Sequence, residues 1–402
     1  MNEKLTSMRN SIEKFLRARY PWDSFKDFAA HQAQKPLPPH VSWWHTFGSL
    51  ALFLLANQIV TGLLLMVYYR PTSDHAFESI RFIQTEVPAG WLIRGLHAWG
   101  AALMICMLIL HMIRVFVMGG YKKPRELTWV TGVLLLGVTV TFGFTGYLLP
   151  WNQLSYWATT VGTEVARAVP FVGNDIALML RGGEGVSGET LGRFYVLHVA
   201  VLPWAIVGLV SIHLFLMRLQ NLATLERVGE EQDIPPHHAV PFFPEHVLKE
   251  LSVFTVFLGF LLALVIFSPP ELGEPADPFN TPVGIKPEWY FLSTYQMLKY
   301  FPKTIGIFTS MIPPLILVLL PFIDRSLERH PKRRPLAMTL GALALVGALA
   351  LGIVGKISET HIRFFGKPYE VDLYGRWTPE EGSAPAADTT VSRAENRTGS
   401  AP

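Results

Sequence analysis

The chain has 402 residues, of which half are hydrophobic and only 16% are charged, and its formal net charge at pH 7 is +3. This composition is typical of a membrane protein and excludes both an ordinary soluble domain and a disordered chain. The single cysteine, Cys106, excludes an internal disulfide and a thiolate cluster, and we expect it to serve only in packing.

Apolar runs of about 20 residues recur along the chain, each long enough to cross about 30 Å of hydrocarbon. They predict seven membrane-spanning helices, at about 47–68, 91–118, 128–149, 194–217, 251–268, 304–323 and 336–355. Residues 1–42 form a charged arm without a cleavable signal sequence, and residues 371–402 are predicted to be a disordered tail. The basic residues of the arm and of the segments 122–125 and 325–334 lie on one side of the membrane, and the positive-inside rule makes that side cytoplasmic.

Two of these runs each contain two histidines, His97 and His111 in the second and His198 and His213 in the fourth. At about 1.5 Å rise per residue, spacings of 14 and 15 residues place the two imidazoles of each helix roughly 21 to 22 Å apart on nearly the same face. Side by side, the two helices would hold two metal centres stacked across the membrane, and two imidazoles on one haem iron suit electron transfer. Four satisfied core histidines are the simpler alternative, but polar groups in lipid are costly and tend to be functional.

Glycines repeat this spacing in the first and third runs. Gly48 and Gly62 are 14 residues apart, and so are Gly132 and Gly146. A missing side chain at each position would let a flat macrocycle approach the helix at two levels. Simple helix packing is the alternative, because small residues are common where membrane helices meet.

Further polar and aromatic residues lie near the ends of the spans. Arg94 and Arg114 flank the histidines of the second run and are candidates to pair with haem propionates, although arginines at helix ends often only reach to the membrane surface. The aromatic stretch from Trp151 to Trp157 predicts a short interfacial helix. Pro287-Glu288-Trp289-Tyr290 again combines aromatic residues with a carboxylate.

Together these stretches resemble the cytochrome b family of respiratory and photosynthetic cytochrome bc complexes. Residues 43–222 are similar to that family's four-helix dihaem core, and residues 223–370 are similar to its three-helix quinol-site half. The resemblance rests on Pro38-Pro39-His40-Val41, Gly95-Leu96-His97, the run from Lys122 to Gly132, Gly146-Tyr147-Leu148-Leu149-Pro150-Trp151, Arg193-Phe194-Tyr195, Gly273-Glu274-Pro275-Ala276-Asp277-Pro278-Phe279 and Lys286-Pro287-Glu288-Trp289-Tyr290-Phe291. It covers roughly residues 20 to 365 and implies an all-α membrane fold with seven spans.

Within that family the chain combines features of two types. The 15-residue interval from His198 to His213 and the seven spans are similar to the chloroplast type, whose four-span and three-span parts are separate chains but are fused here. Lys249-Glu250 resembles instead the lysine–aspartate pair at the inner quinone site of the mitochondrial type. Where the chloroplast type has a cysteine that holds a third haem, this chain has Thr46, so we expect no covalently attached haem there.

The resemblance implies two non-covalent b-type haems, the outer one bound by His97 and His198 and the inner one by His111 and His213. It implies that a quinol at the outer face gives one electron to a partner Rieske iron–sulfur protein and the other to the outer haem, and that the inner haem reduces a quinone. A c-type cytochrome would accept the Rieske electron. We expect a homodimeric complex in a bacterial cytoplasmic membrane, with no nucleic-acid partner.

Quinol oxidation needs a base that takes up a proton in a pocket of low dielectric constant. Glu288 fits, because a carboxylate beside aromatic residues should have a raised pKa. Tyr147 and Tyr290 are candidates to donate hydrogen bonds in the same pocket, although interfacial tyrosines often serve only as membrane anchors.

An inner quinone site is predicted from four residues on the cytoplasmic side: Arg218, Lys249, Glu250 and His31. Together they would supply the cations, carboxylate and imidazole that a quinone needs as it gains two electrons and two protons. For each residue taken alone, the simpler interpretation is an ordinary charged side chain at the membrane surface.

Two other classes of protein share some of these features. A seven-span transporter with a histidine proton relay would explain the buried polar residues, but not the repeated glycine spacing. A dihaem membrane anchor of a dehydrogenase or hydrogenase would share the histidine pairs, but would leave the Glu288 motif and the segment from Tyr147 to Trp157 without a purpose.

Overall fold

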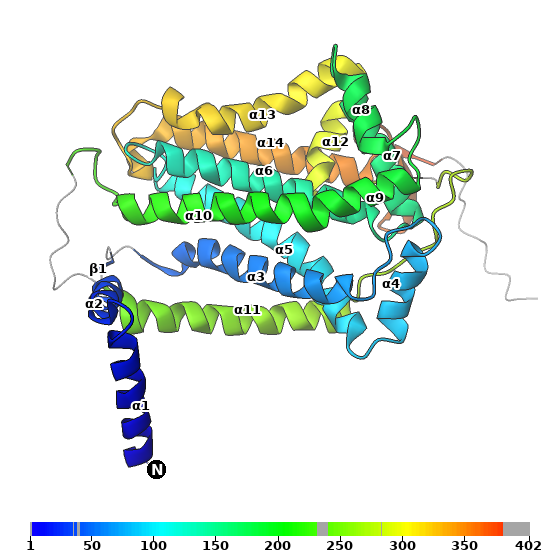
Figure 1. The fold of residues 1–402 in the computed structure, drawn as a ribbon. Coiled ribbons are helices and arrows are strands. Elements are labelled where there is room, and N and C mark those ends of the chain that lie inside the picture. Colours follow the sequence, from blue (N-terminus) through cyan, green and yellow to red (C-terminus); the bar gives the residue numbers. More distant parts are fainter. Residues whose placement is uncertain (1, 35, 38–40, 231–239, 283, 381–402) are drawn as a thin grey trace, which may run out of the picture.

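The structure is a computed structural model, and it describes residues 2–34, 36–37, 41–230, 240–282 and 284–380. Long helices run side by side in a bundle, with short helices and a small sheet at one end and α1 and α2 at the other (Figure 1). The α-helices are α1 (Asn2–Arg17), α2 (Trp22–Ala33), α3 (Phe47–Met66), α4 (Ala76–Thr85), α5 (Gly90–Val117), α6 (Glu126–Leu148), α7 (Gln153–Arg167), α8 (Gly173–Arg181), α9 (Gly188–Val196), α10 (Leu202–Gln220), α11 (Val247–Phe267), α12 (Leu292–Lys299), α13 (Lys303–Ile323) and α14 (Pro335–Ile357).

Short turns and strands complete the described fold. The 3-10 and π-helical turns are η1 (Trp43–Thr46), η2 (Leu197–Val201), η4 (Phe242–His246), η5 (Trp289–Phe291) and η6 (Pro331–Arg333). Strands β1 (Pro36–Leu37) and β2 (Val240–Pro241) pair antiparallel. Strands β3 (Thr360–Phe364), β4 (Lys367–Val371) and β5 (Trp377–Pro379) form an antiparallel sheet in that order. We call the end of the bundle with α1, α2 and the loops 119–125 and 324–334 the basic end, and the end with α4, α7 and β3–β5 the sheet end.

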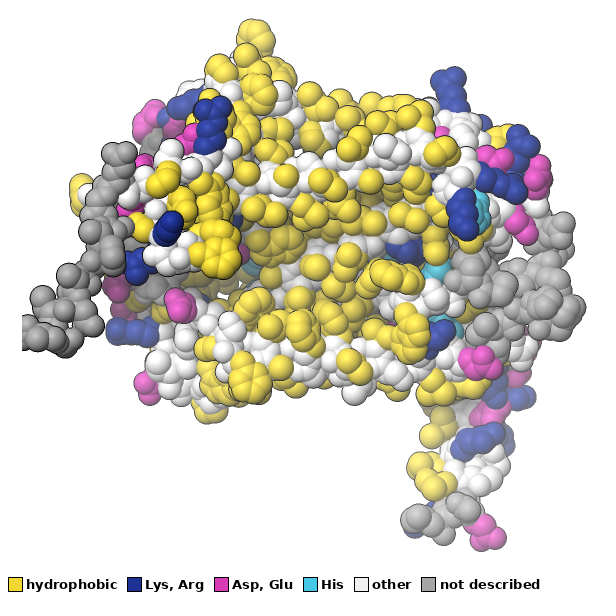
Figure 2. Space-filling model, turned by 180° about the vertical axis from the view of Figure 1, so that it is seen from behind, with side chains coloured by type: hydrophobic (Ala, Val, Ile, Leu, Met, Phe, Trp, Pro, Cys, Tyr) yellow, Lys and Arg dark blue, Asp and Glu magenta, His cyan; other side chains and the backbone are white. Residues whose placement is uncertain are grey.

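Seven helical segments of the described chain are long and apolar enough to cross a membrane: Trp43–Met66, Gly90–Val117, Glu126–Leu148, Gly188–Gln220, Phe242–Phe267, Lys303–Ile323 and Pro335–Ile357. They confirm the seven predicted spans. The fifth begins nine residues before the predicted start. Charged residues in its first turns lower the mean hydropathy there, so the sequence did not indicate that these turns belong to the span. A broad apolar band covers the side of the bundle seen in Figure 2, as lipid contact requires.

The structure adds elements outside the spans. The predicted interfacial helix is present as α7, which is longer than the aromatic stretch, and α1 and α2 lie in the charged arm. The predicted disordered tail is wrong at its start, because Trp377–Pro379 pair with β4 as strand β5. The ring of Trp377 packs on Phe364 of β3 and Tyr369 of β4, at 5.4 and 5.8 Å between ring centres, so neighbouring strands stabilise β5 despite the low overall hydropathy. Residues 381–402 lie outside the described chain.

The spans pack in pairs around one apolar core. Helix α3 packs on α5, and α6 packs on α10. Between the two pairs lies a cluster of buried residues that includes Leu54, Met104, Leu135 and Ile206, with Leu261 of α11 closing its side. Met104 and Leu135 lie near the middle of α5 and α6, and Ile206 lies near the middle of the span Gly188–Gln220. The apolar core therefore separates two levels at which polar side chains enter the bundle.

Candidate functional site

The four span histidines lie at two levels of the bundle. At the sheet end, the ring centres of His97 on α5 and His198 on η2 are 6.3 Å apart, with the ring planes inclined by 70°. At the basic end, His111 and His213 are close enough for their charges to interact. Metal–imidazole bonds are about 2 Å long, so two imidazole nitrogens on opposite sides of one ion lie about 4 Å apart, with each ring centre a ring radius further out. The observed separation of His97 and His198 fits that arrangement.

Each of the four predicted glycines lies against one histidine ring. A Cβ atom built on Gly48 would lie 2.9 Å from Cε1 of His111, and one on Gly62 would lie 3.3 Å from Cε1 of His97. On α6 the corresponding distances are 3.3 Å from Gly132 to His213 and 2.6 Å from Gly146 to His198. The histidine rings therefore occupy the space of the missing side chains. The equal spacing of glycines and histidines has a direct structural basis.

Three threonines hold the histidine rings in one orientation, and the sequence interpretation missed them. Oγ1 of Thr61 is 2.9 Å from Nδ1 of His97, and Oγ1 of Thr145 is 3.1 Å from Nδ1 of His198. Thr131 makes the equivalent contact with His213 at 3.0 Å. Each threonine hydroxyl also donates to a carbonyl of its own helix, so its oxygen is placed to accept from Nδ1–H and leave Nε2 as the ligand.

A signal for these threonines was present in the sequence. Each directly precedes one of the predicted glycines, as Thr61-Gly62, Thr131-Gly132 and Thr145-Gly146. The fourth glycine, Gly48, follows a phenylalanine, and the histidine that it faces has a different neighbour, because Nη2 of Arg114 is 3.4 Å from Nδ1 of His111.

A π-helical turn explains why the two histidine spacings differ by one residue. His198 lies in η2, where the amide of Leu202 donates to the carbonyl of Leu197, five residues back. A π-turn holds one residue more than an α-turn, and Pro203, which follows, has no amide hydrogen to restore the regular ladder. The 15-residue interval from His198 to His213 therefore covers the same number of turns as the 14 residues from His97 to His111.

The donor set fits haem better than a metal ion held by protein alone. Among the described residues, no group of three or more histidine, cysteine, aspartate or glutamate side chains is placed to hold a metal. Two facing imidazoles with glycine-lined helices beside them leave the other ligands to a planar macrocycle. The Nε atom of Arg114 is buried without a hydrogen-bond partner in the structure, which a propionate would supply.

Arg94 has several partners within the protein. Its guanidinium donates to Oε1 of Gln84 at 3.0 Å and to the carbonyls of Pro270 and Glu271 at 2.6 and 3.1 Å. These bonds tie the start of α5 to the loop after α11. Pairing of Arg94 with a haem propionate stays a prediction.

The Glu288 motif lies at the sheet end, between the two halves of the bundle. Glu288 precedes η5 and is half-buried, and its charge interacts with Tyr147 of α6 and with Tyr290. Burial raises the pKa of the Glu288 carboxyl above its ordinary value, and the nearby Lys356 partly offsets this. Gly143 makes room for Tyr290, whose hydroxyl lies 2.8 Å from the position of a Cβ there. The three predicted residues are thus brought together.

Lys286 fixes this segment in place and was not predicted. Its Nζ donates to the carbonyls of Lys356 and Ser358, at 2.6 and 2.7 Å, at the end of α14. On the other side, the ring of Phe291 meets Phe144 of α6 edge to face at 6.2 Å. The Glu288 carboxylate is therefore held between α6 and α14.

Two of the four residues predicted for an inner quinone site, Glu250 and Arg218, lie around His246 and Phe242 at the start of α11. Glu250 accepts a hydrogen bond from Ser49 of α3, and its Oε1 is 3.2 Å from Nε2 of His246. The guanidinium of Arg218 lies 5.5 Å from the ring of Phe242, which is beside the His246 ring.

The other two members of the predicted inner set are placed differently. Lys249 lies over the ring of Trp43, at 5.5 Å. His31 is exposed on α2, and the described contacts do not join it to Glu250 or Arg218. Ser49 and His246 were missed by the sequence interpretation, although His246 is four residues before Glu250 on the same helix face.

These features define a multi-pass membrane protein whose central helices pair histidines at two levels, with a half-buried carboxylate between its two halves. The family model for cytochrome b/b6/petB matches residues 32–221, and that for cytochrome b(C-terminal)/b6/petD matches residues 275–369. The chain belongs to the cytochrome b family, and it is the cytochrome b subunit of a bc-type complex. Its two halves are fused in one chain.

Relatives agree along most of the chain. The cytochrome bc complex cytochrome b subunit of Chlorobaculum thiosulfatiphilum is 41% identical over 84% of this chain and 79% of its own. Cytochrome b of Marchantia polymorpha is 37% identical over 82% of each chain. Among solved structures, a chain of a hyperthermophilic respiratory Complex III matches with a TM-score of 0.80 and 33% identity, over 86% of this chain and 92% of that one. Membership of this family implies haem and a role in electron transport, and it removes the transporter and membrane-anchor alternatives.

Proposed function

We propose that this subunit oxidises a quinol at the sheet end and reduces a quinone at the basic end, as part of a quinol:cytochrome c oxidoreductase. The observation that carries this proposal is the stacking of two histidine pairs, each ring lying against a glycine, between a half-buried carboxylate at one end and a polar cluster at the other. Two b-type haems held by His97 with His198 and by His111 with His213 would supply a path for electrons between the two faces.

Oxidation of one quinol releases two electrons and two protons. We propose that one electron passes to a Rieske iron–sulfur protein of the complex, and from it to a c-type cytochrome, while the other crosses the membrane. Two quinols oxidised in turn would supply the two electrons that reduce one quinone. Glu288 accepts a proton from the quinol hydroxyl, because burial makes it a stronger base than an exposed carboxylate. Tyr147 and Tyr290, beside it, orient the quinol through their hydroxyls.

At the basic end, Glu250 and His246 are placed to deliver protons to the quinone, and Arg218 supplies a positive charge as the quinone accepts electrons. Proton release at one face and uptake at the other would contribute to a transmembrane proton gradient. The basic residues at this end support its placement on the cytoplasmic side by the positive-inside rule. We propose that the complex is a homodimer in a bacterial cytoplasmic membrane. With Thr46 in place of a cysteine, no covalently attached third haem is proposed.

The haem assignment is tested with His198→Leu. The variant should insert normally, since its spans stay apolar, but its reduced-minus-oxidised spectrum should lose the signal of one of two haems. Two unaltered haems would remove His198 from the pocket.

The role of Glu288 is tested with Glu288→Gln, which keeps the shape of the side chain and removes the base. Quinol oxidation should slow by about 10²- to 10⁴-fold, the usual contribution of a general base, while both haem signals remain. Glu271→Gln is the matched control, because Glu271 is an exposed carboxylate earlier in the same loop. Equal rates in the two variants would assign Glu288 a structural role.

A further inference from the structure

Helix α1 lies before the part of the chain that matches the cytochrome b family, which begins at residue 32. Four of its apolar side chains, Leu5, Met8, Ile12 and Phe15, recur at intervals of three and four residues, so they share one face of the helix. We call these four residues the α1 apolar face. Each of them is more than half exposed in the structure. Because an apolar stripe of this length in water is unfavourable, it indicates a contact with something apolar.

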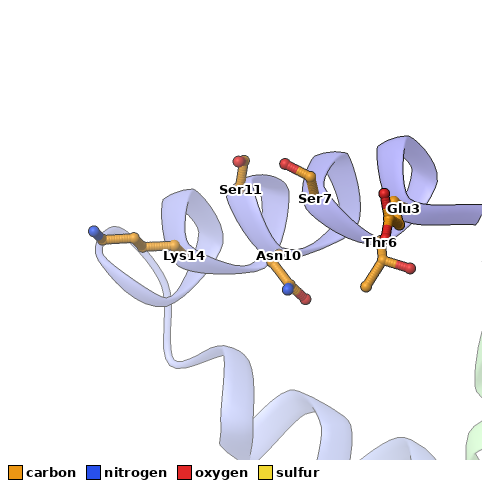
Figure 3. A pocket seen from close by; sticks show the side chains of 6 residues that line it. All are labelled: Glu3, Thr6, Ser7, Asn10, Ser11 and Lys14. Carbon is orange, nitrogen blue, oxygen red and sulfur yellow. The ribbon is translucent and has the colours of Figure 1, made fainter.

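The opposite face of α1 is polar throughout. Figure 3 shows this polar face, with the side chains of Glu3, Thr6, Ser7, Asn10, Ser11 and Lys14. At 100° per residue, Lys4 and Arg9 fall on the two borders between the polar and apolar faces. The helix as a whole has four basic and two acidic residues. A basic border around an apolar stripe is the pattern of a helix that lies in a membrane surface.

The placement of α1 agrees with that pattern. The helix lies across the direction of the spans and extends past α11 at the basic end (Figure 1). In Figure 2 the hydrophobic side chains of this arm gather on its side toward the apolar band of the bundle, and charged side chains on its other side. Exposed apolar residues of η4 and the start of α11, Phe243, Leu248 and Leu251, continue the apolar surface at this level.

Ion pairs fix the corner between α1 and α2. Glu13 pairs with Lys26 of α2 and, at 3.0 Å, with Arg17, and Arg17 also pairs with Asp23 at 3.2 Å. The charged residues of α1 in these pairs, Glu13 and Arg17, lie on its polar side and at its C-terminal end. The pairs therefore do not cover the α1 apolar face. They hold α1 at an angle to α2 and leave the α1 apolar face free for another contact.

We propose that α1 is an in-plane membrane anchor, whose apolar face enters the leaflet at the basic end while its basic residues bind anionic phospholipid headgroups. Two observations favour lipid over a partner protein. The apolar face is turned toward the level at which the apolar band of the bundle begins, and the basic border is complementary to anionic headgroups. This anchoring does not depend on the haem ligands or on Glu288.

The test compares cysteine variants on the two faces of α1, Met8→Cys and Asn10→Cys, in the purified complex with all its subunits. Each is placed in nanodiscs of phosphatidylcholine with or without phosphatidylglycerol, and in native membranes. A water-soluble maleimide measures accessibility, and the parent chain, which retains Cys106, provides the blank. Haem content equal to that of the parent shows that each variant is assembled.

We expect Met8→Cys to react at least about tenfold more slowly than Asn10→Cys in nanodiscs with phosphatidylglycerol, because an apolar helix face lies about 5–10 Å deep in the headgroup region. A probe attached at position 8, but not at position 10, should be quenched by lipids that carry a spin label on the acyl chain. Protection should weaken without phosphatidylglycerol. Equal reactivity at both positions in nanodiscs would overturn the proposal, and protection of position 8 in native membranes alone would assign the face to a protein partner instead.

Discussion

Replacing Gly146 by alanine tests the tightest of the four contacts between glycine and histidine. The added Cβ would lie 2.6 Å from Cε1 and 3.2 Å from Nδ1 of His198. Carbon atoms in contact are about 3.5–4.0 Å apart, so the imidazole would have to move by about 1 Å. The His198 ring cannot move away easily, because the hydroxyl of Thr145, the residue before Gly146 on α6, contacts its Nδ1. Overpacking of this kind costs about 1–3 kcal/mol, which is roughly a 5- to 150-fold loss of affinity for a haem bound there.

Two other glycines of α6 provide a graded comparison. Gly132→Ala brings its Cβ only to 3.3 Å from His213, and Gly137→Ala meets nothing within 4 Å. Haem retained after purification and after mild heating should therefore fall in the order Gly137→Ala, Gly132→Ala, Gly146→Ala, as measured by the reduced-minus-oxidised spectrum per polypeptide. If Gly146→Ala kept both haems as firmly as Gly137→Ala, the histidine at this level would not be a haem ligand in the orientation described.

Three further predictions concern neighbours of the proposed sites. Thr145→Val should weaken haem retention at His198 by about 10- to 100-fold, the usual effect of losing an outer-shell partner, whereas Thr141→Val on the exposed side of α6 should not. Quinol oxidation should fall as the pH drops through the raised pKa of Glu288, above the value near 4.3 of an exposed glutamate, and Glu288→Gln should lack this acid limb. Glu250→Gln should slow reoxidation of the inner haem by quinone, and an unchanged rate would remove Glu250 from the proposed inner site.

The spans and the positions of the histidines could be predicted because they depend on local periodicity. Hydrophobic runs of membrane length are strong signals, since backbone polar groups in lipid must be satisfied within each helix. The 14-residue spacing of Gly132 and Gly146 was informative for a similar reason, because a helix converts spacing along the chain into height in the membrane. Both signals describe one helix at a time.

Contacts between helices could not be predicted in this way. Ser49 and Glu250 are 201 residues apart in sequence, and Lys286 meets the end of α14 more than 60 residues later. The π-turn at His198 depends on the backbone hydrogen bonds of the helix, which Pro203 interrupts, and a hydropathy pattern does not indicate such a turn. Strand β5 was missed because a short edge strand is stabilised by its neighbours more than by its own composition.

The histidines at the two levels have different polar neighbours, and the difference places a positive charge beside only one pair. At the sheet end, His97 and His198 each meet a threonine hydroxyl, and the cation of Arg94 is turned to loop carbonyls. At the basic end, the guanidinium of Arg114 lies beside His111 instead. A fixed positive charge in a medium of low dielectric constant stabilises whichever state of a nearby centre carries more electrons. If two haems occupy these levels as proposed, the charge of Arg114 favours an electron at the basic end over the sheet end, and a propionate bound to Arg114 would reduce this difference.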